Sequence, residues 1–188
     1  MTDIPPSPME PWLHWADYHW KHQVFTLVAS QRGLSLLALP HDRENVVSEF
    51  LKAHPARQAS ENSRQLAPYL EQLDAYFSAE RTAFDLPVAI LSGTAFQRRV
   101  WQALRQIPYG QTRSYAEVAT LIEHPRAYRA VGTAVSQNPV SIVIPCHRVI
   151  GSNGTLTGFA GGLELKQHLL HLEGVHDVKD KGHAKYAY

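Results

Sequence analysis

The stretch TAFQRRVWQALRQIPYGQTRSYAEVATLIEHPRAYRAVGTAVSQ, residues 94–137, decides the fold that we expect of this chain. It contains two capping boxes, Thr94 with Gln97 and Ser114 with Glu117, in which side-chain oxygens satisfy the free N–H groups at a helix start. After the first box, apolar residues recur at helical spacing along one face. The four residues of this stripe are Phe96, Val100, Leu104 and Ile107.

Two further helices follow in close succession. The second capping box opens a short helix through Ile122, and Pro125, which a first helical turn tolerates, opens another that runs to about Asn138. Two short helices joined by a turn predict a helix-turn-helix. Gly132 inside the later helix costs up to about 1 kcal/mol relative to Ala, so we expect either the preceding helix or a DNA backbone to approach it closely.

The N-terminal half begins with β-branched and aromatic residues. Val24–Ala29 and Leu34–Leu39 are separated by a short polar stretch that ends in Gly33, which predicts a hairpin with Gly33 at positive φ. Three histidines and three tryptophans stand nearby, and we expect them to pack on the sheet rather than to bind a metal. They are His14, His19, His22, Trp12, Trp15 and Trp20.

Helical spacing returns after the hairpin. Apolar residues three and four apart predict one helix around residues 46–51 and a second around residues 66–77. The segment Asp85–Leu91, with Pro87 near its start, is typical of a short edge strand. The first 90 residues thus predict a small α/β domain in which we recognise no chemistry.

The single cysteine is followed directly by two residues with basic side chains. The β-branched run Ile142–Ile144 predicts a strand that stops at Pro145, and Cys146, His147 and Arg148 follow directly. A lone cysteine is often a small buried hydrophobe, but a thiol beside an imidazole and a guanidinium can be held as a thiolate.

Histidine can act on this thiol in two arrangements. Neighbours in an extended segment point to opposite faces, so either the chain turns here or the imidazole reaches the sulfur through a water. A histidine that takes the thiol proton also needs a partner for its other nitrogen. The acidic candidates in this half are Glu117, Glu123, Glu164 and Glu173.

Composition narrows the class of protein. The 188 residues, 44% of them hydrophobic, suffice for one or two globular domains. No window approaches the roughly 18 apolar residues of a membrane helix, and the N-terminus lacks a basic-then-apolar leader, so we expect a cytoplasmic protein that contacts no membrane. The single cysteine excludes an intrachain disulfide and a multi-cysteine zinc site.

The net charge of +1 hides an asymmetry. Residues 1–93 hold seven basic and eleven acidic side chains, whereas residues 94–188 hold eleven and six. A basic half is typical of a domain that faces a polyanion, although a split of this size also arises by chance. The candidate phosphate contacts are Arg98, Arg99, Arg105, Arg113, Arg126 and Lys166.

The span from about Gly93 to Gly174 carries a dense set of motifs. They are Gly93-Thr94-Ala95-Phe96-Gln97, Val100-Trp101, Ile107-Pro108, Ser114-Tyr115, Arg129-Ala130-Val131-Gly132, Asn138-Pro139, Pro145-Cys146-His147-Arg148-Val149, Gly161-Gly162-Leu163, Lys166 and Glu173-Gly174. On these residues the span resembles the O6-alkylguanine-DNA alkyltransferase family, whose members transfer an alkyl group from damaged guanine to their own cysteine. The acidic N-terminal half is similar in kind to the variable α/β domain of such proteins.

The resemblance implies a role for each matching residue. Cys146 is the implied alkyl acceptor, His147 abstracts its proton through a water, Glu173 orients the histidine, and Tyr115 donates a hydrogen bond to the guanine. Arg129 is implied to fill the space left by the flipped base. The remaining implied residues are Ala127, Ala130, Ala134 and Thr94 against DNA, Val149, Phe159, Ala160 and Lys166 around the guanine, and Asn138 as a brace.

Two positions depart from the pattern of the family. Glu123 precedes His124 and Pro125 where relatives generally have a glycine in the turn, which places an acid near the expected DNA face. Phe159 replaces a common tyrosine, which keeps the ring but removes a hydroxyl.

We therefore expect an α+β fold, with a small N-terminal α/β domain that has a short antiparallel sheet (residues 1–91). A mainly helical, winged-helix-like domain with the helix-turn-helix (92–175) and a polar, disordered tail (176–188) follow. The expected function is single-turnover DNA repair by a monomer without cofactor or metal, on double-stranded DNA that contains O6-alkylguanine, with O4-methylthymine left open. Two alternatives remain, a non-catalytic damage-binding protein of similar fold and a thiol hydrolase; Cys146 counts against the first, and the lack of an oxyanion-hole motif against the second.

Overall fold

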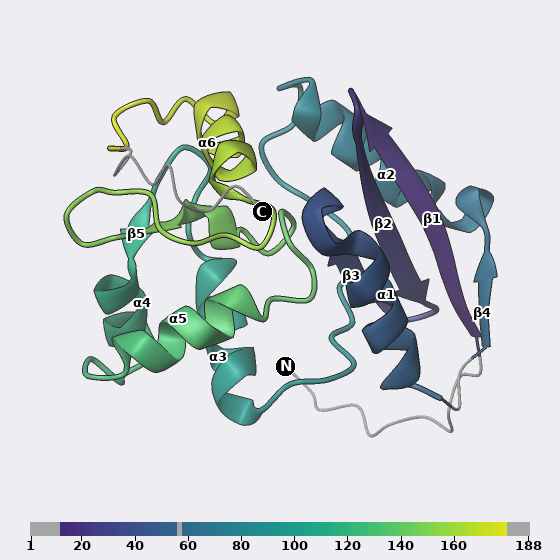
Figure 1. The fold of residues 1–188 in the computed structure, drawn as a ribbon, viewed down its shortest axis with the longest axis horizontal. Coiled ribbons are helices and arrows are strands. Elements are labelled where there is room, and N and C mark those ends of the chain that lie inside the picture. Colours follow the sequence, from purple (N-terminus) through teal and green to yellow (C-terminus); the bar gives the residue numbers. More distant parts are fainter. Residues whose placement is uncertain (1–11, 56–57, 180–188) are drawn as a thin grey trace.

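The computed structural model describes residues 12–55 and 58–179, and it has the α+β fold that the sequence predicts (Figure 1). A sheet with two α-helices forms the N-terminal half, and the other α-helices of the described residues lie in the C-terminal half. In chain order, the elements are β1 (Trp12–Trp20), β2 (Gln23–Ser30), β3 (Gly33–Ala38), the 3-10 turn η1 (Pro40–Asp42), α1 (Arg43–Lys52), β4 (Gln58–Glu61), α2 (Ser63–Phe77), α3 (Ala95–Leu104), β5 (Arg113–Ser114), α4 (Tyr115–Leu121), α5 (Tyr128–Ser136), the 3-10 turn η2 (Cys146–Arg148), β6 (Val149–Ile150) and α6 (Leu163–Leu172).

The N-terminal sheet has the strand order β3-β2-β1-β4. The predicted hairpin is confirmed as β2 and β3, which pair antiparallel, and Gly33 has a φ of 134°. A Cβ at Gly33 would collide with the Pro87 carbonyl, so only glycine fits this turn. The antiparallel part is β1 to β3, whereas β4, which the sequence did not predict, pairs with β1 in parallel.

A helix covers each face of the sheet, which explains why every residue of β3 is buried. Helix α1 packs on one face with a small apolar cluster of Leu13, Val28, Leu36 and Ala38. Helix α2 packs on the other face, where Leu66, Leu73 and Phe77 join a larger core. That core continues without a break into the C-terminal half.

The outer edge of β3 is covered by two short pieces of chain. Leu34 exchanges hydrogen bonds with Pro87 and Ala89, and the Leu37 N–H donates to the Pro139 carbonyl at 2.8 Å. The edge strand predicted at residues 85–91 is therefore only a single bridge at Val88. Proline at position 87 has no N–H to extend the ladder on that side.

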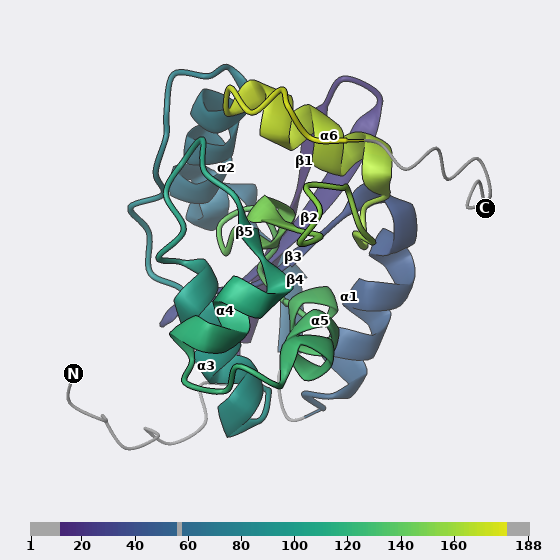
Figure 2. The same cartoon turned by 90° about the vertical axis from the view of Figure 1, so that its left-hand side faces the viewer.

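Both predicted capping boxes are present, and α3, α4 and α5 pack against one another (Figure 2). The expectation that Pro125 lies in a first helical turn is wrong. The Ala127 N–H donates to the His124 carbonyl, which closes a turn around Pro125, and α5 begins only at Tyr128. The close partner of Gly132 is the preceding helix, because a Cβ at Gly132 would lie 3.8 Å from the ring of Tyr115.

The segment before the cysteine is not the predicted strand. Ile142 has a φ of 71°, which is rare for a β-branched residue, and the Val143 N–H donates to the Ser141 carbonyl across a γ-turn. The run of β-branched residues is explained by burial, since Ile142 and Ile144 are both enclosed in the core.

The polar tail is partly ordered, contrary to the prediction. Lys179 exchanges backbone hydrogen bonds with Gly154 and Leu156, so the chain is paired up to this residue. Residues 180–188 lie outside the described part of the chain, as do residues 1–11. Within the described ranges, no helix is long and apolar enough to cross a membrane.

Two helices end in the same backbone motif without the glycine that it favours. At the end of α4, the His124 N–H donates to Ala119 and the Glu123 N–H to Thr120, which is a Schellman motif with Glu123 at a φ of 63°. Helix α2 ends in the same way with Ala79 at a φ of 59°. A Cβ in this left-handed region costs about 1–2 kcal/mol.

We predict that Glu123→Gly raises the free energy of unfolding by about 0.5–1 kcal/mol, because relief of the Cβ strain exceeds the added entropy of the unfolded chain. Ala79→Gly should give a similar gain at the other helix end. Urea denaturation measures both. Ala75→Gly, one turn earlier inside α2, is the matched control and should lose stability by up to about 1 kcal/mol. Equal losses for Ala79→Gly and Ala75→Gly would contradict the prediction.

Candidate active site

Cys146 lies where the chain turns, not at the end of a strand. Pro145 forms an inverse γ-turn, in which the Cys146 N–H donates to the Ile144 carbonyl at 2.8 Å, and η2 follows directly. The thiol is 4% exposed. Of the two arrangements that the sequence left open, the chain therefore adopts the turn.

The loop before the cysteine is fixed by one amide. Asn138 donates from its side-chain nitrogen to the Ile144 carbonyl at 2.8 Å and accepts from the Val140 N–H at 3.1 Å. The hydroxyl of Ser141 lies 3.9 Å from the Cys146 sulfur, within weak hydrogen-bond range. These contacts join the end of α5 to the thiol.

A single carboxylate organises the other side of the site. Glu173 caps the C-terminus of α6, its side chain is fully buried, and both of its oxygens accept several hydrogen bonds. The donors to Oε1 are Tyr76, His147 and Arg148, and the donors to Oε2 are Arg148 and the Gly110 N–H. Burial alone would raise the pKa of Glu173, but the hydrogen bonds from His147 and Arg148 and the charge of Arg148 lower it to about 2.

Arg148 does not stabilise a thiolate at Cys146, contrary to the sequence-based expectation, because its guanidinium is bound elsewhere. Its guanidinium holds Glu173 through Nε at 2.8 Å and Nη2 at 2.9 Å, and Nη1 donates to the Ile107 carbonyl. Such a two-pronged ion pair fixes the plane of the carboxylate. The chain turn at η2 explains the outcome, because it directs this side chain to Glu173.

The contacts of His147 define its tautomer. Its Nε2 lies 2.8 Å from Glu173 Oε1, and an ionised carboxylate only accepts, so Nε2 carries the proton. Burial lowers the pKa of His147, and this outweighs the opposing effect of Glu173, so the ring is neutral at pH 7. Its Nδ1 is buried and has no hydrogen-bond partner among the described residues. The ring is thus oriented with a free lone pair, which is what a base requires.

The free thiol is not held as a thiolate. Burial raises the pKa of Cys146, and the hydrogen bonds of Asn138 and Ser141 and the charge of Lys166 offset this only in part. The expectation of a stabilised thiolate is therefore wrong for the free protein. A standing thiolate does not explain reactivity here, so the proton has to leave as the sulfur reacts.

Lys166 is buried beneath the site and cannot contact a phosphate, which corrects that assignment. Its ammonium donates to the carbonyls of Val149 at 2.6 Å and Thr157 at 3.1 Å. Burial lowers the pKa of Lys166 to about 8. The ammonium thus ties Val149, three residues after the cysteine, to the glycine-rich loop of residues 157–162.

Tyr115 and the glycine-rich loop close the site from the side of the helix-turn-helix. The Tyr115 hydroxyl lies 3.0 Å from the Thr157 hydroxyl. Phe159 is half-buried beside Gly161, and Ala160 is exposed at the tip of the same loop. Burial raises the pKa of Tyr115, so this hydroxyl stays protonated and can donate.

Helix α5 presents part of the predicted binding face. Arg129 is exposed, with its guanidinium 5.8 Å from the ring centre of the exposed Tyr128, and Ala130 is exposed beside it. Ala127 is half-buried at the start of the helix, and Thr94 is exposed at the start of α3.

Ala134 does not belong to this face, which corrects the expectation. It is buried, and its carbonyl accepts the indole N–H of Trp101 at 2.8 Å. Five residues after Arg129, it lies on the inner side of α5.

Tyr76 is a contact of the site that the sequence did not predict. It lies on α2 in the N-terminal half, and its hydroxyl donates to Glu173 Oε1 at 2.6 Å. In the sequence it is one member of an apolar stripe, and only the position of its hydroxyl in the fold distinguishes it from a core aromatic.

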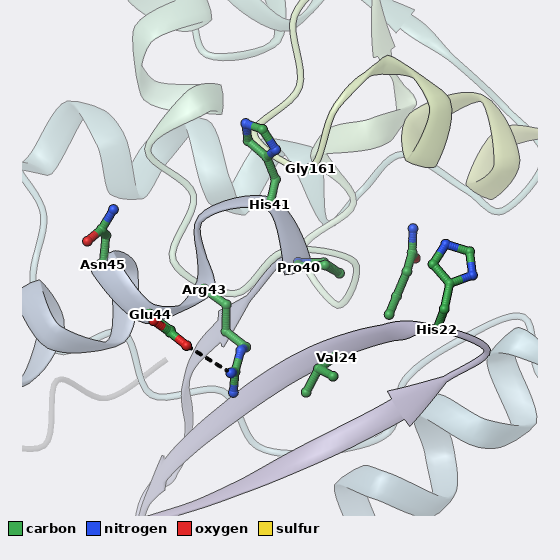
Figure 3. A pocket seen from close by; sticks show the side chains of 9 residues that line it. His22, Val24, Pro40, His41, Arg43, Glu44, Asn45 and Gly161 are labelled. Carbon is green, nitrogen blue, oxygen red and sulfur yellow. Dashed lines mark ion pairs between the residues drawn. The ribbon is translucent and has the colours of Figure 1, made fainter. Parts of the chain in front are cut away.

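A separate polar pocket of about 600 Å³ lies between the β1–β2 turn, η1 and Gly161 (Figure 3). His22 and His41 line it, and its arginine, Arg43, is paired with Asp17 at 2.9 Å and with Glu44 at 3.6 Å. The thiol, the imidazole and Glu173 do not line this pocket. This pocket is therefore separate from the group of Cys146, His147 and Glu173.

Each half of the chain matches the model of a known protein domain. Residues 13–90 match the ribonuclease-like domain of 6-O-methylguanine DNA methyltransferase, and residues 95–175 match the DNA-binding domain of the same family. These matches span most of the described residues. The exact domain boundaries near residue 91 and residue 175 stay predictions.

Individual relatives extend over nearly the whole chain. An inducible methylated-DNA–protein-cysteine methyltransferase of Bacillus subtilis is 41% identical over 165 residues, 87% of this chain and 92% of the relative. One from Mycolicibacterium paratuberculosis is 57% identical over 117 residues, 62% of this chain and 70% of the relative. The O6-methylguanine methyltransferase of Mycobacterium tuberculosis has a crystal structure that superposes on this one with a TM-score of 0.73 and a sequence identity of 38%. The superposition covers 86% of this chain and 92% of the mycobacterial chain. A further M. tuberculosis structure, in complex with DNA, is 39% identical with a TM-score of 0.72 and covers 85% and 92%.

We predict that Glu173→Gln lowers the free energy of unfolding at pH 7 by about 3–5 kcal/mol, because it leaves the buried Arg148 without its anion. Urea denaturation measures the loss. Glu164→Gln, an exposed substitution on the same helix, should change stability by less than about 0.5 kcal/mol.

The difference in the free energy of unfolding between wild type and Glu173→Gln should also depend on pH. The folded pKa of Glu173 lies below the unfolded value of about 4.3, so its contribution is complete above that pH and is lost as the pH falls towards about 2. The difference between wild type and Glu173→Gln should narrow over this range. A difference that stays constant from pH 7 to pH 2.5 would contradict the assignment.

Proposed function

Because the chain belongs to the 6-O-methylguanine DNA methyltransferase family, it is a methylated-DNA–protein-cysteine methyltransferase, and we propose that Cys146 is the residue that accepts the alkyl group. The reaction repairs O6-alkylguanine in double-stranded DNA. The observation that carries the assignment of residues is the buried series of Glu173, His147 and Cys146, with Nε2 of the imidazole held and Nδ1 left free.

The transfer is a displacement at the alkyl carbon. His147 takes the thiol proton on Nδ1, through a bridging water, as the sulfur attacks. A carbon–sulfur bond forms while the bond between that carbon and guanine O6 breaks, and the electron pair of that bond goes to the guanine. The purine anion takes up one proton from water to become ordinary guanine, which balances the proton that His147 took from the thiol. The thioether that remains on Cys146 is stable, so each molecule reacts once.

The site accelerates this step by arrangement more than by acidity of the thiol. An ordinary thiol with a pKa near 8.5 is only a few per cent thiolate at pH 7, and burial lowers that fraction further here. Most of the rate must come from holding the alkyl carbon in line with the sulfur and from donors to the departing guanine oxygen. Tyr115, protonated and adjacent to the loop that lines the site, is our candidate donor.

The buried thiol requires the damaged nucleotide to leave the helix. Flipping costs a few kcal/mol and is least costly for a base that pairs badly, so weak pairing of the lesion contributes to selectivity. The exposed Arg129 on α5 fills the gap in the base stack, and Ala127 and Ala130 allow the helix to approach the minor groove. Val149, Phe159 and Ala160 line the pocket that receives the base.

Phosphate contacts supply much of the affinity and make it fall with salt. Five of the candidate cations remain for this role after Lys166 is removed, namely Arg98, Arg99, Arg105, Arg113 and Arg126. Glu123, exposed beside Arg126 in the turn between α4 and α5, opposes them by its charge. We expect the protein to act as a cytoplasmic monomer without a cofactor, because thiol, base and alkyl donor complete the reaction.

The two alternatives lack support. A non-catalytic damage-binding protein would not need the oriented imidazole beside the thiol. A thiol hydrolase would need a set of donors for an oxyanion, and the sequence around Cys146 carries no oxyanion-hole motif.

The test is transfer of label from duplex DNA that carries radiolabelled O6-methylguanine. We expect one methyl group per protein, located on Cys146 by peptide mass mapping, and no turnover beyond the first equivalent. Cys146→Ser should bind the same duplex but accept no label.

Other outcomes of this experiment favour the alternatives. Binding of the lesion by wild type without transfer would indicate a damage-binding protein. Turnover of an acyl substrate without methyl transfer would indicate a hydrolase.

A further inference from the structure

Tyr76 connects the N-terminal half to the reacting residues across 97 positions of sequence. It is the second-to-last residue of α2, within the last turn, and its ring is completely buried. The hydroxyl donates to Glu173 Oε1 at 2.6 Å and lies 3.4 Å from His147 Nε2. The hydroxyl therefore contacts both His147, the proposed base, and Glu173, the carboxylate that orients it.

The ring of Tyr76 is held by its neighbours. Phe77, Phe84 and Tyr109 lie around it, with ring centres at 5.7, 5.2 and 6.3 Å. The hydroxyl position is thus fixed by aromatic packing, and packing alone would be served as well by phenylalanine. The polar atom has to be explained by what it contacts.

We propose that Tyr76 is a positioning residue of the catalytic centre, which holds Glu173 Oε1 against His147 and thereby makes the N-terminal half part of the site. This inference rests on the proposed function. It assigns to the N-terminal half a part in the alkyl transfer itself, in addition to packing.

The Tyr76 hydroxyl affects the protonation of His147 because both groups donate to the same oxygen, Oε1 of Glu173. This oxygen accepts from three donors, Tyr76, His147 and Arg148. Without the tyrosine hydroxyl, more of its charge acts on the imidazole, which favours the protonated form of His147. Besides Glu173, the charged groups that act on the ring are Arg148 and Lys166, and the substitution leaves both in place.

The experiment measures the single-turnover rate of methyl transfer between pH 5.5 and pH 9 for wild type and Tyr76→Phe. We expect Tyr76→Phe to react roughly five- to tenfold more slowly at pH 7, the size of a partial loss of one hydrogen bond to a charged group. Because His147 must be neutral to act, the acid limb of the profile should shift to higher pH by about half a unit.

Tyr69→Phe is the matched control. Tyr69 lies on the same helix two turns earlier, and its hydroxyl contacts the Pro87 carbonyl instead of the site. This variant should keep the wild-type rate and profile. Thermal melting of both variants reports how much stability each substitution costs.

A second variant keeps the ring and the hydroxyl. Replacement of Tyr76 by 3-fluorotyrosine makes the phenol a stronger donor, so the acid limb should shift to lower pH, opposite to Tyr76→Phe. Opposite shifts support the proposal.

Two outcomes would overturn it. If Tyr76→Phe melts at a lower temperature but keeps the wild-type pH profile, Tyr76 only packs the core and the proposal is wrong while the proposed function stands. If wild type itself transfers no methyl group, the proposed function fails and this inference fails with it.

Discussion

The structure depends on one buried negative charge, the carboxylate of Glu173. A carboxylate removed from water is costly unless its oxygens are fully paired, and here five hydrogen bonds from four residues surround it. Two of these partners are fixed by further contacts, Arg148 by the Ile107 carbonyl and Tyr76 by aromatic packing. The imidazole of His147 is therefore held in one tautomer before any substrate arrives, which is the preorganisation that a base needs.

The same charge joins distant parts of the chain. Its partners come from α2, from the turn after α3 and from η2, while the carboxylate itself ends α6. The edge of β3 adds a second connection, because Leu37 binds the Pro139 carbonyl at the start of the loop that leads to Cys146. The two halves therefore form one continuous core, and the family match over both halves is consistent with a shared role. The thiol is shielded from solvent, so the function that we propose requires the damaged base to be brought to it.

The sequence predicted correctly those features that depend on contacts between residues close together in the chain. The two capping boxes and the Gly33 turn are confirmed because their partners lie within a few residues. Strand β4 was missed because QASE has no apolar pattern and pairs only through the fold. The run before Cys146 was wrongly predicted as a strand, since contacts of Asn138 and Leu37 impose turns on residues that favour strands. The thiol and the imidazole were singled out from the residues themselves, and Glu173 was chosen among four acids by the family resemblance. The partner of Arg148 and the hydroxyl of Tyr76 depend on non-local packing that one sequence does not show.

The protonation of His147 in the free protein tests the central claim most directly. Nitrogen-15 NMR of histidine-labelled wild type at pH 7, with His147 assigned by its loss in His147→Gln, distinguishes the two nitrogens of the ring. We predict a neutral ring with the proton on Nε2 and a bare Nδ1. A proton on Nδ1, or a ring that is charged at pH 7, would show that Glu173 does not prepare His147 to receive the thiol proton.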